Sequence, residues 1–391
     1  MIIEPKIRNS ICLTAHPAGC AAEVDRQIEY IQSRGPIPGG PKKILVIGAS
    51  TGYGLASRIA AAFGAGAATI GVAFEKPGRD KGPGTAGFYN LRRFDERARE
   101  KGLYARSFNG DAFSHELKAE VLEAIEEDLG QVDLVVYSLA SPARKDPDTG
   151  ELYMSAIKPI GRSYRAKSVE FLTGEVKEAE VPPATEEEIA NTLKVMGGED
   201  WELWMKALAD RNLLAPRVKT VAYSYIGPEV TRPIYRRGTI GNAKEHLEAT
   251  ARKLTADLAH LKAEAYVSVN KALVTKAAAV IPVVALYISI LYKVMKAKGL
   301  HEGCIEQMDR LFRDRLYTAE GTVPRDQDGL IRIDDWEMQS DVQEEVDRVW
   351  ELINSDNVND YTDLEGYKEE FLKINGFAVE GVDYEAEVSP L

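Results

Sequence analysis

Several features that would place this chain in a special class are scarce or missing. Three cysteines in 391 residues, Cys12, Cys20 and Cys304, are too few and too scattered for a disulfide framework. The longest uncharged stretches, residues 59–74 and 277–292, are shorter than the ~20 residues that a membrane-spanning helix needs. The opening segment MIIEPKIRNS lacks the charged start and continuous apolar run of a signal peptide. We therefore expect a cytoplasmic protein without a membrane span.

Positive charge is also in deficit. The 49 lysines and arginines face 61 aspartates and glutamates, and the net charge of −12 argues against general binding to nucleic acid or to a membrane surface. The rest of the composition is ordinary, since 45% hydrophobic residues provide ample material for a core. Acidic residues concentrate from Asp334 onward, whereas the stretch around Tyr235 is basic.

Short β-branched runs alternate with longer helical patterns, which predicts βα units and a parallel sheet. The run KILVI at Lys43–Ile47 is almost wholly apolar, as expected for a strand covered on both faces. Apolar residues at helical spacing between Asn242 and Leu261 predict a long amphipathic helix. Four further runs are predicted to be strands: Thr69–Phe74, Leu134–Ser138, Thr220–Tyr225 and Ala265–Asn270.

We therefore expect an α/β fold, a Rossmann-type doubly wound parallel sheet, in three parts. Residues 1–40 would form an N-terminal extension and residues 41–320 the dinucleotide-binding and catalytic domain. The acidic residues 321–391 would form a C-terminal helical cap packed on the main domain. The polar segment 151–195 is predicted to be an insertion over the sheet.

A glycine-rich turn follows the first predicted strand. Gly48, Gly52 and Gly54 form a G-x3-G-x-G pattern that opens a helix. Glycine lets the backbone turn sharply and approach a pyrophosphate, and the helix N-terminus offers free N–H groups to that anion. Strand, glycines and helix in this order predict a dinucleotide site.

Polar and small residues at later strand ends fit the same scheme. Glu75 ends the second strand, 21 residues beyond Gly54, where it can accept hydrogen bonds from the adenosine ribose and repel a 2′-phosphate. This favours NADH over NADPH, although the nearby Lys76 and Arg79 weaken the discrimination. Asp111-Ala112 would lie near the adenine, and Leu139-Ala140 would pass the cofactor ribose.

A tyrosine and a lysine stand nine positions apart at Tyr235 and Lys244. On one straight helix, nine residues correspond to about 900°, which would place the two side chains on opposite faces. They can act together only if Tyr235 lies on a loop before the helix of Lys244, and Gly238 and Gly241 make such a break plausible. The ammonium would then bind the nicotinamide ribose and favour negative charge on the phenol.

This combination resembles the bacterial NADH-dependent trans-2-enoyl-thioester reductases, relatives of the short-chain dehydrogenases. The family comprises trans-2-enoyl-CoA reductase and the large single-chain enoyl-acyl carrier protein (ACP) reductase. The likeness runs through most of the chain, in the segments ICLTAHPAGC, VIGASTGYGLASRIAAAFG, GDAF, YSLASP, VMGGEDWELW, AYSYIGPE, SVNKALVTKA and HEGCIEQ.

The resemblance assigns roles residue by residue. Tyr225 matches the substrate-binding tyrosine, Tyr235 the catalytic proton donor, and Lys244 a catalytic residue that also contacts the cofactor. The family's remaining cofactor-binding positions match Gly48, Ala49, Ser50, Thr51, Gly52, Tyr53, Phe74, Glu75, Asp111, Ala112, Leu139, Ala140, Leu273, Val274 and Thr275.

The resemblance implies reduction of trans-2-enoyl-CoA to saturated acyl-CoA by NADH in fatty acid synthesis. Hydride would go to the β-carbon, and Tyr235 would stabilise or protonate the enolate. The alternative is the same reaction on enoyl-ACP, with the carrier protein as a partner, and the wording SVNKALVTKA leans towards the CoA enzymes. A monomer or weak homodimer is expected.

The basic stretch near Tyr235 has two interpretations. Arg232, Arg236, Arg237 and Lys244, with no acid among them, suit the phosphates of CoA or phosphopantetheine. A solvated basic edge explains the same four residues equally well.

Two further functions stay open on the residues alone. The long Tyr–Lys spacing argues against a short-chain carbonyl reductase, and the intact Tyr–Lys pair argues against a sensor that binds NADH without turnover. The C-terminal part resembles a segment sometimes labelled flavin-binding in this family, but its residues show no flavin site. No metal site is expected, because Cys12, His16 and Cys20 lack a fourth ligand and Pro17 interrupts the helix that would align them.

Overall fold

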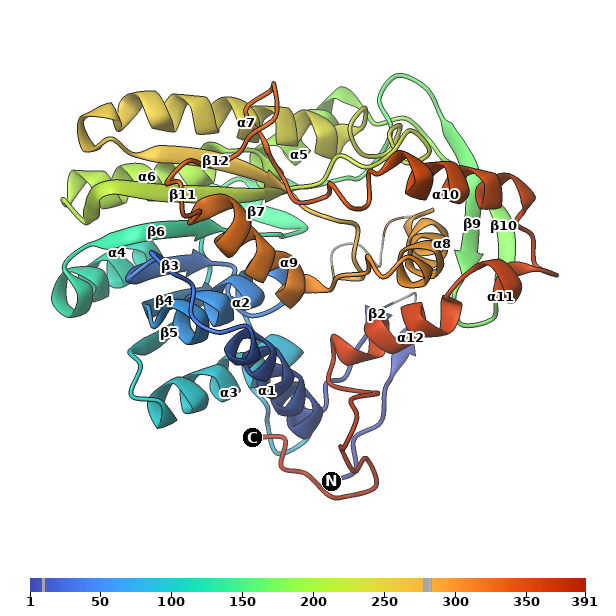
Figure 1. The fold of residues 1–391 in the computed structure, drawn as a ribbon, viewed down its shortest axis with the longest axis horizontal. Coiled ribbons are helices and arrows are strands. Elements are labelled where there is room, and N and C mark those ends of the chain that lie inside the picture. The colour runs from blue at the N-terminus through green and yellow to red at the C-terminus, as the bar shows by residue number, and fades with distance from the viewer. Residues whose placement is uncertain (9–10, 277–280, 282) are drawn as a thin grey trace.

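The computed structural model describes residues 1–8, 11–276, 281 and 283–391, and these form a seven-stranded sheet at the centre of the molecule (Figure 1). The strand order is β13-β12-β11-β6-β3-β4-β5, and every neighbouring pair is parallel. The chain enters at β3 and winds outward in both directions, so the doubly wound Rossmann-type prediction is confirmed. The strands are β3 (Lys43–Ile47), β4 (Ala68–Ala73), β5 (Ala105–Asn109), β6 (Val132–Tyr137), β11 (Leu214–Ser224), β12 (Glu264–Val269) and β13 (Ile331–Arg332).

Strand β3 lies where the winding direction reverses. Ile47 is in register with Val72 of β4 on one side and with Tyr137 of β6 on the other. The last four residues of β3 have no exposed surface, because helices cover both faces of the sheet. That double cover explains why the strand is apolar throughout instead of alternating.

Two helical layers sandwich the sheet. One face carries α1 (Pro17–Ser33), α2 (Gly52–Ile59), α3 (Ala86–Glu100) and α9 (Cys304–Leu311), and the other carries α4 (His115–Ala124), α6 (Glu199–Asp210) and α7 (Thr239–Asp257) (Figure 1). Helix α5 (Glu186–Met196) packs on the outside of α7. Single helical turns extend several of these helices: η1 (Ala60–Gly64), η2 (Ile125–Leu129), η3 (Ala259–Leu261) and η4 (Phe312–Leu316).

A second body of structure stands beyond the carboxyl ends of the strands, on the right in Figure 1. Helix α8 (Val284–Ala297) is its centre, and α10 (Ser340–Leu352) and α12 (Leu364–Lys373) pack against it around their own apolar core. The antiparallel strands β9 (Tyr164–Glu170) and β10 (Glu175–Val181) join the same core. Smaller elements here and near the N-terminus are β1 (Ile7–Arg8), β2 (Ile11–Cys12), β7 (Ala143–Lys145), β8 (Leu152–Met154) and α11 (Val358–Tyr361).

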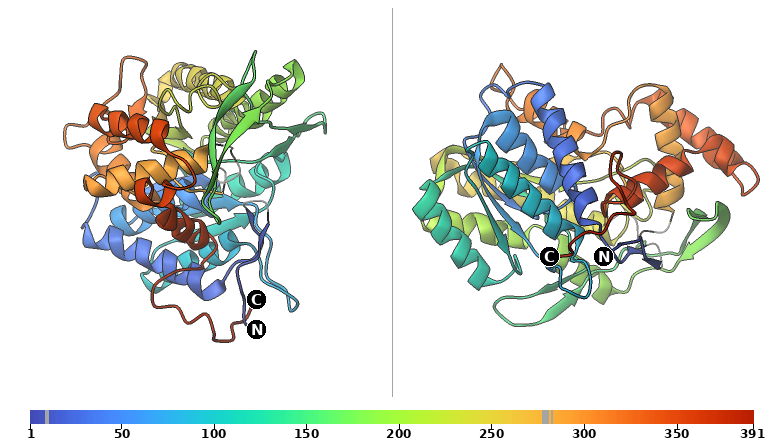
Figure 2. Two further views of the ribbon diagram at one scale, coloured as in Figure 1. Left: turned by 90° about the vertical axis from the view of Figure 1, so that its right-hand side faces the viewer. Right: turned by 90° about the horizontal axis from the view of Figure 1, so that it is seen from below.

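The two chain ends meet on one side of the molecule, as both views of Figure 2 show. The Met1 ammonium donates to the Val388 carbonyl at 2.9 Å, and the Val388 N–H donates to the Met1 carbonyl at 3.0 Å. Among the described residues, no helix is both long and apolar enough to cross a bilayer.

Candidate active site

The glycine-rich turn lies at the reversal point of the sheet. Gly48 has a φ of +87°, and a Cβ there would lie 2.4 Å from the Ser138 carbonyl oxygen at the end of β6. A Cβ on Gly54 would lie 1.9 Å from the Gly48 carbonyl oxygen, so α2 can begin this close to β3 only without a side chain. Both glycines are therefore required by the close packing of strand, turn and helix.

The start of α2 is open to a ligand. Gly52 has a φ of +55°, and a Cβ there would meet no atom within 4 Å. The preceding Thr51 side chain caps none of the first N–H groups of the helix. Uncapped N–H groups at a helix start bind anions, and an uncrowded glycine leaves room for one.

Glu75 is fixed beside this turn. Its Oε1 accepts a hydrogen bond from Ser50 Oγ at 2.6 Å. Its backbone exchanges two hydrogen bonds with the Asn109 side chain, at 2.7 and 2.8 Å. The preceding Phe74 is 79% exposed, so a large apolar ring lies uncovered next to the acid. This arrangement can hold a ribose and present a flat surface to an adenine.

The loops after β5 and β6 complete the same edge. Asp111 accepts the Phe113 N–H at 3.0 Å, while the Ala112 carbonyl accepts hydrogen bonds from Lys118 Nζ and Trp204 Nε1. Trp201 and Trp204 are fully buried, so core packing is their role. After β6, Leu139 is half-buried and Ala140 is exposed.

The predicted nicotinamide-side segment faces the glycine turn across a cavity. A hollow of about 110 Å³ is lined in part by Thr51 and Gly52 and, on the far side, by Val274 and Thr275. Leu273 and Val274 are buried, and the Val274 N–H donates to the Tyr292 hydroxyl at 3.2 Å. The structure thus brings together two segments that the sequence separates by more than 200 residues.

Two tyrosines pack against each other beyond the end of β11. The rings of Tyr225 and Tyr235 meet edge to face, with centroids 4.7 Å apart. Tyr235 is only 7% exposed, and within the described residues its hydroxyl makes no hydrogen bond. Burial and the nearby Glu337 carboxylate raise the pKa of Tyr235. Both influences disfavour the phenolate form, and the expectation that Lys244 favours negative charge on this phenol stays a prediction.

Lys244 lies near the start of α7. As predicted, the chain breaks between the two residues, because Tyr235 lies in the turns before the helix begins at Thr239. Lys244 Nζ donates to the Tyr223 carbonyl at 2.9 Å, and burial lowers the pKa of Lys244 to about 8. Among the described residues, no hydrogen bond joins Lys244 to Tyr235.

The arginines near Tyr235 are ion-paired, which corrects the prediction of an acid-free basic edge. Arg236 contacts Glu248 at 2.6 Å, and Glu229 contacts both Arg232 at 2.5 Å and Arg237 at 3.2 Å. Glu229 precedes the arginines in the chain, and Glu248 lies on α7. The fold therefore brings both glutamates against the basic stretch. These charges are therefore largely compensated within the chain.

Sequence reasoning missed Glu337, which lies between β13 and α10 and has no exposed surface. Its Oε1 accepts hydrogen bonds from the hydroxyls of Tyr225 at 3.0 Å and Tyr287 at 2.7 Å. No motif or spacing marks this glutamate among the many acids of the C-terminal segment, and only the fold brings it beneath the tyrosine pair.

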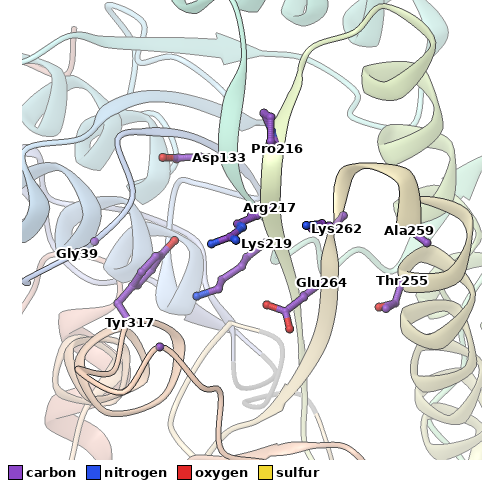
Figure 3. A pocket seen from close by; sticks show the side chains of 13 residues that line it. Gly39, Asp133, Pro216, Arg217, Lys219, Thr255, Ala259, Lys262, Glu264 and Tyr317 are labelled. Atoms are coloured by element: carbon purple, nitrogen blue, oxygen red, sulfur yellow. The ribbon is translucent and has the colours of Figure 1, made fainter.

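A larger hollow of about 710 Å³ lies at the opposite edge of the sheet (Figure 3). It is lined by residues at the amino ends of the strands, among them Asp133, Lys219 and Glu264. None of the predicted site residues lines it. Ligands of open α/β sheets bind at the carboxyl ends of the strands, so the glycine turn and the tyrosine pair mark the candidate active site.

His16, which the sequence places with Cys12 and Cys20, has a structural role at the start of a helix. Pro17 is the first residue of α1, and His16 caps that helix by accepting the Gly19 N–H at 3.2 Å. Within the part of the chain that the structure describes, no three His, Cys, Asp or Glu side chains gather as a metal site.

Three family models match the chain in succession. Residues 2–80 match the NAD(P)H binding domain of trans-2-enoyl-CoA reductase. Residues 82–317 match the trans-2-enoyl-CoA reductase catalytic region, and residues 325–388 match the enoyl reductase FAD binding domain.

Individual relatives cover the whole chain. A protein of Cytophaga hutchinsonii named enoyl-[acyl-carrier-protein] reductase [NADH] is 58% identical over 389 residues, covering 100% of this chain and 98% of its own length. A protein of Edwardsiella ictaluri with the same name is 58% identical over 390 residues, with the same coverage of both chains.

Solved structures agree with this family. The trans-2-enoyl-CoA reductase of Treponema denticola, crystallised with NAD, is 54% identical with a TM-score of 0.96, covering 99% of this chain and 98% of that one. The Clostridium acetobutulicum trans-2-enoyl-CoA reductase, crystallised with NADH, is 45% identical with a TM-score of 0.97, covering 100% and 98%. Because the catalytic-region model matches residues 82–317 and these relatives cover nearly the whole chain, this chain belongs to the trans-2-enoyl-CoA reductase family.

Proposed function

We propose that this chain is an oxidoreductase that uses NADH to reduce the carbon–carbon double bond of trans-2-enoyl thioesters. The observation that carries the proposal is the buried Tyr235, which packs on Tyr225 at the same end of the sheet as the glycine turn and Glu75. The names of the relatives support the same reaction class.

The residues present fit NADH. The open helix start at Gly52 would hold the pyrophosphate, and Glu75 would accept hydrogen bonds from the adenosine ribose. Leu273 to Thr275, across the cavity from the glycine turn, would line the nicotinamide side together with Lys244. When bound, NADH supplies the hydride that reduces the β-carbon of the substrate.

Tyr235 would act on the charge that this reduction creates. Negative charge develops on the thioester oxygen as the β-carbon is reduced, and a protonated phenol at that oxygen stabilises it by a hydrogen bond. Because burial raises the pKa of Tyr235, its proton is retained at neutral pH until the substrate needs it. One well-placed donor of this kind is worth about 10²- to 10³-fold in rate. The enolate then takes up a proton at the α-carbon, given by Tyr235 and replaced from solvent.

We propose coenzyme A as the thiol carrier, with acyl carrier protein as the alternative. The solved relatives are named for the CoA thioester, and the curated relatives for the carrier-protein thioester. The arginines near Tyr235 do not separate the two, because each is paired with a glutamate of the chain.

The segment 325–388 does not fit a flavin. A Cβ on Gly376 would collide with the His16 carbonyl and the Cys20 N–H, and one on Gly366 would collide with the Asp363 carboxylate. Its helices pack on α8, and among its described residues no glycine turn joins β13 to α10 as in a dinucleotide cradle. The proposed reaction needs no flavin.

Purified protein should oxidise NADH when given crotonyl-CoA or crotonyl-ACP, and not when given saturated butyryl-CoA. The ratio of kcat/KM for the two unsaturated substrates identifies the carrier, and a ratio above one for crotonyl-CoA is the expected result. Absence of turnover with both, in protein that binds NADH, would overturn the proposed function. Turnover of simple ketones instead would establish a carbonyl reductase.

A further inference from the structure

Glu337 brings a buried carboxylate from the C-terminal segment to the tyrosine pair. Three donors satisfy it: the Tyr225 hydroxyl at 3.0 Å and the Tyr287 hydroxyl at 2.7 Å, both to Oε1, and the Ala272 N–H at 2.7 Å to Oε2. An ionised carboxylate is an acceptor only, so three donors converging on it describe a buried anion that the fold has built a site for.

A buried cation lies in the same region. Lys271 is 2% exposed, and its Nζ donates to the Ala272 carbonyl at 3.1 Å. Burial raises the pKa of Glu337, and the charge of Lys271 opposes part of that increase. The lysine and the three hydrogen bonds together favour the carboxylate form against the cost of burial.

The carboxylate decides where the proton of Tyr225 points. A phenol has one proton, and that of Tyr225 is donated to Glu337. Towards the substrate, Tyr225 then presents only the lone pairs of its oxygen. The hydroxyl of Tyr235, by contrast, is not engaged by any described residue.

We propose that Glu337 is a positioning residue that turns the Tyr225 hydroxyl away from the substrate, so that Tyr235 alone donates to the thioester oxygen. This inference rests on the proposed enoyl reduction. It separates the two tyrosines into one donor and one neighbour that shapes the pocket, although they are chemically identical and packed together.

The backbone makes a sharp test possible. In Glu337→Gln, the amide oxygen must face the Ala272 N–H, because the amide NH2 group would meet a second donor there. The NH2 group then faces Tyr225 and Tyr287 and donates to their oxygens. The proton of Tyr225 is released and can point towards the substrate.

The experiment compares single-turnover reduction of crotonyl-CoA in four proteins: wild type, Tyr235→Phe, Glu337→Gln and the double variant. Tyr235→Phe should lose activity, and adding Glu337→Gln should restore about tenfold of it, a part of the 10²- to 10³-fold that one donor provides. A role of Glu337 in stability alone predicts the opposite, a further loss in the double variant. That result would overturn the inference. Glu344→Gln, an exposed carboxyl of α10, is the matched control and should rescue nothing.

A second measurement keeps the inference testable if the glutamine variant folds poorly or the enzyme is inactive on enoyl thioesters. Tyrosine labelled with ¹³C at Cζ reports phenol hydrogen bonding by NMR, and Tyr225→Phe assigns the signal of Tyr225. Loss of the anionic acceptor in Glu337→Gln should move that signal. A moved signal without any turnover would reject the proposed function and keep the Glu337 arrangement, whereas an unmoved signal would reject the arrangement itself. If Glu337→Gln does not fold, Tyr225→Phe provides the test. We expect Tyr225→Phe to lower kcat much less than Tyr235→Phe does, and an equal decrease in kcat would contradict the inference.

Discussion

Glu75 is the side chain expected to select NADH over NADPH. It lies beside the glycine turn and holds Ser50 Oγ at 2.6 Å, which directs the rest of the carboxylate towards the expected ribose. A 2′-phosphate placed there would meet a fixed negative charge, and we propose this repulsion as the physical basis of the NADH preference.

We predict that Glu75→Gln raises kcat/KM for NADPH relative to NADH by about tenfold or more, which corresponds to ~1.4 kcal/mol. The amide keeps the shape of the side chain and can still accept from Ser50 Oγ, but it removes the repelling charge. Steady-state kinetics with both cofactors checks the ratio. Glu120→Gln, an exposed change on α4, is the control, and an unchanged ratio in Glu75→Gln would refute the role of the charge.

Lys244 should give the reaction a pH dependence. Burial lowers the pKa of Lys244 to about 8, so the ammonium is present below that pH and is lost as the pH rises through it. If the ammonium holds the cofactor ribose, the affinity for NADH falls above pH 8. Burial also lowers the pKa of Lys271 to about 8. The pH profile of the wild type therefore does not by itself show which of the two lysines titrates.

The variant Lys244→Arg separates the two lysines, because an arginine stays charged through this whole range. We expect the NADH affinity of this variant to be nearly independent of pH between 7 and about 10. Fluorescence titration of NADH at several pH values measures it. A fall above pH 8 that persists in Lys244→Arg would assign the titration to another group.

At the scale of elements, the contact between α2 and β3 controls the cofactor site. A Cβ on Gly54 would approach the Gly48 carbonyl oxygen to 1.9 Å, and backbone atoms cannot yield as a flexible side chain can. Gly54→Ala should therefore displace the start of α2 and lower NADH affinity by at least about tenfold. Isothermal titration calorimetry tests this, with Gly66→Ala as the control.

Gly66 has a φ of +69° but open space around it, so its substitution strains the backbone without moving α2. We expect Gly66→Ala to lower the melting temperature and to leave NADH affinity unchanged. Equal affinities for the two alanine variants would show that close packing of α2 does not shape the site.

The elements that sequence could predict are those whose pattern is local. The strand at Lys43–Ile47 has the predicted bounds, because an apolar run between turn residues fixes them. The helix predicted to open at the glycine pattern is α2 from Gly52, followed by the η1 turn Ala60–Gly64. Strand β13 was missed, because a two-residue strand has no periodicity to read.

The site was predictable in the same uneven way. The glycine turn, Glu75 and the tyrosine–lysine pair follow from motifs and spacing, and the structure places them at one edge of the sheet. Glu337 and the glutamate partners of the arginines depend on contacts between distant segments, which no local pattern contains. The family resemblance assigned positions but not the protonation of the two tyrosines.

At the scale of the whole molecule, the candidate active site lies between two bodies of structure. The sheet with its glycine turn would provide the cofactor side, and the core around α8, α10 and α12 lies opposite it (Figure 1). Glu337 lies just before α10 and bonds Tyr225 from that second body. The C-terminal cap is therefore part of the site, since it contributes a buried group beneath the tyrosine pair. That the enzyme works as a monomer or weak homodimer stays a prediction.

The central claim is that Tyr235 supplies the hydrogen bond on which reduction depends. Its most direct test is the single-turnover rate of NADH oxidation with crotonyl-CoA in wild type and Tyr235→Phe, alongside the Kd for NADH of each protein. We predict a rate loss of about 10²- to 10⁴-fold with NADH affinity unchanged, because the phenyl ring keeps the packing on Tyr225 and loses only the donor. A variant that retains the wild-type rate would contradict the account.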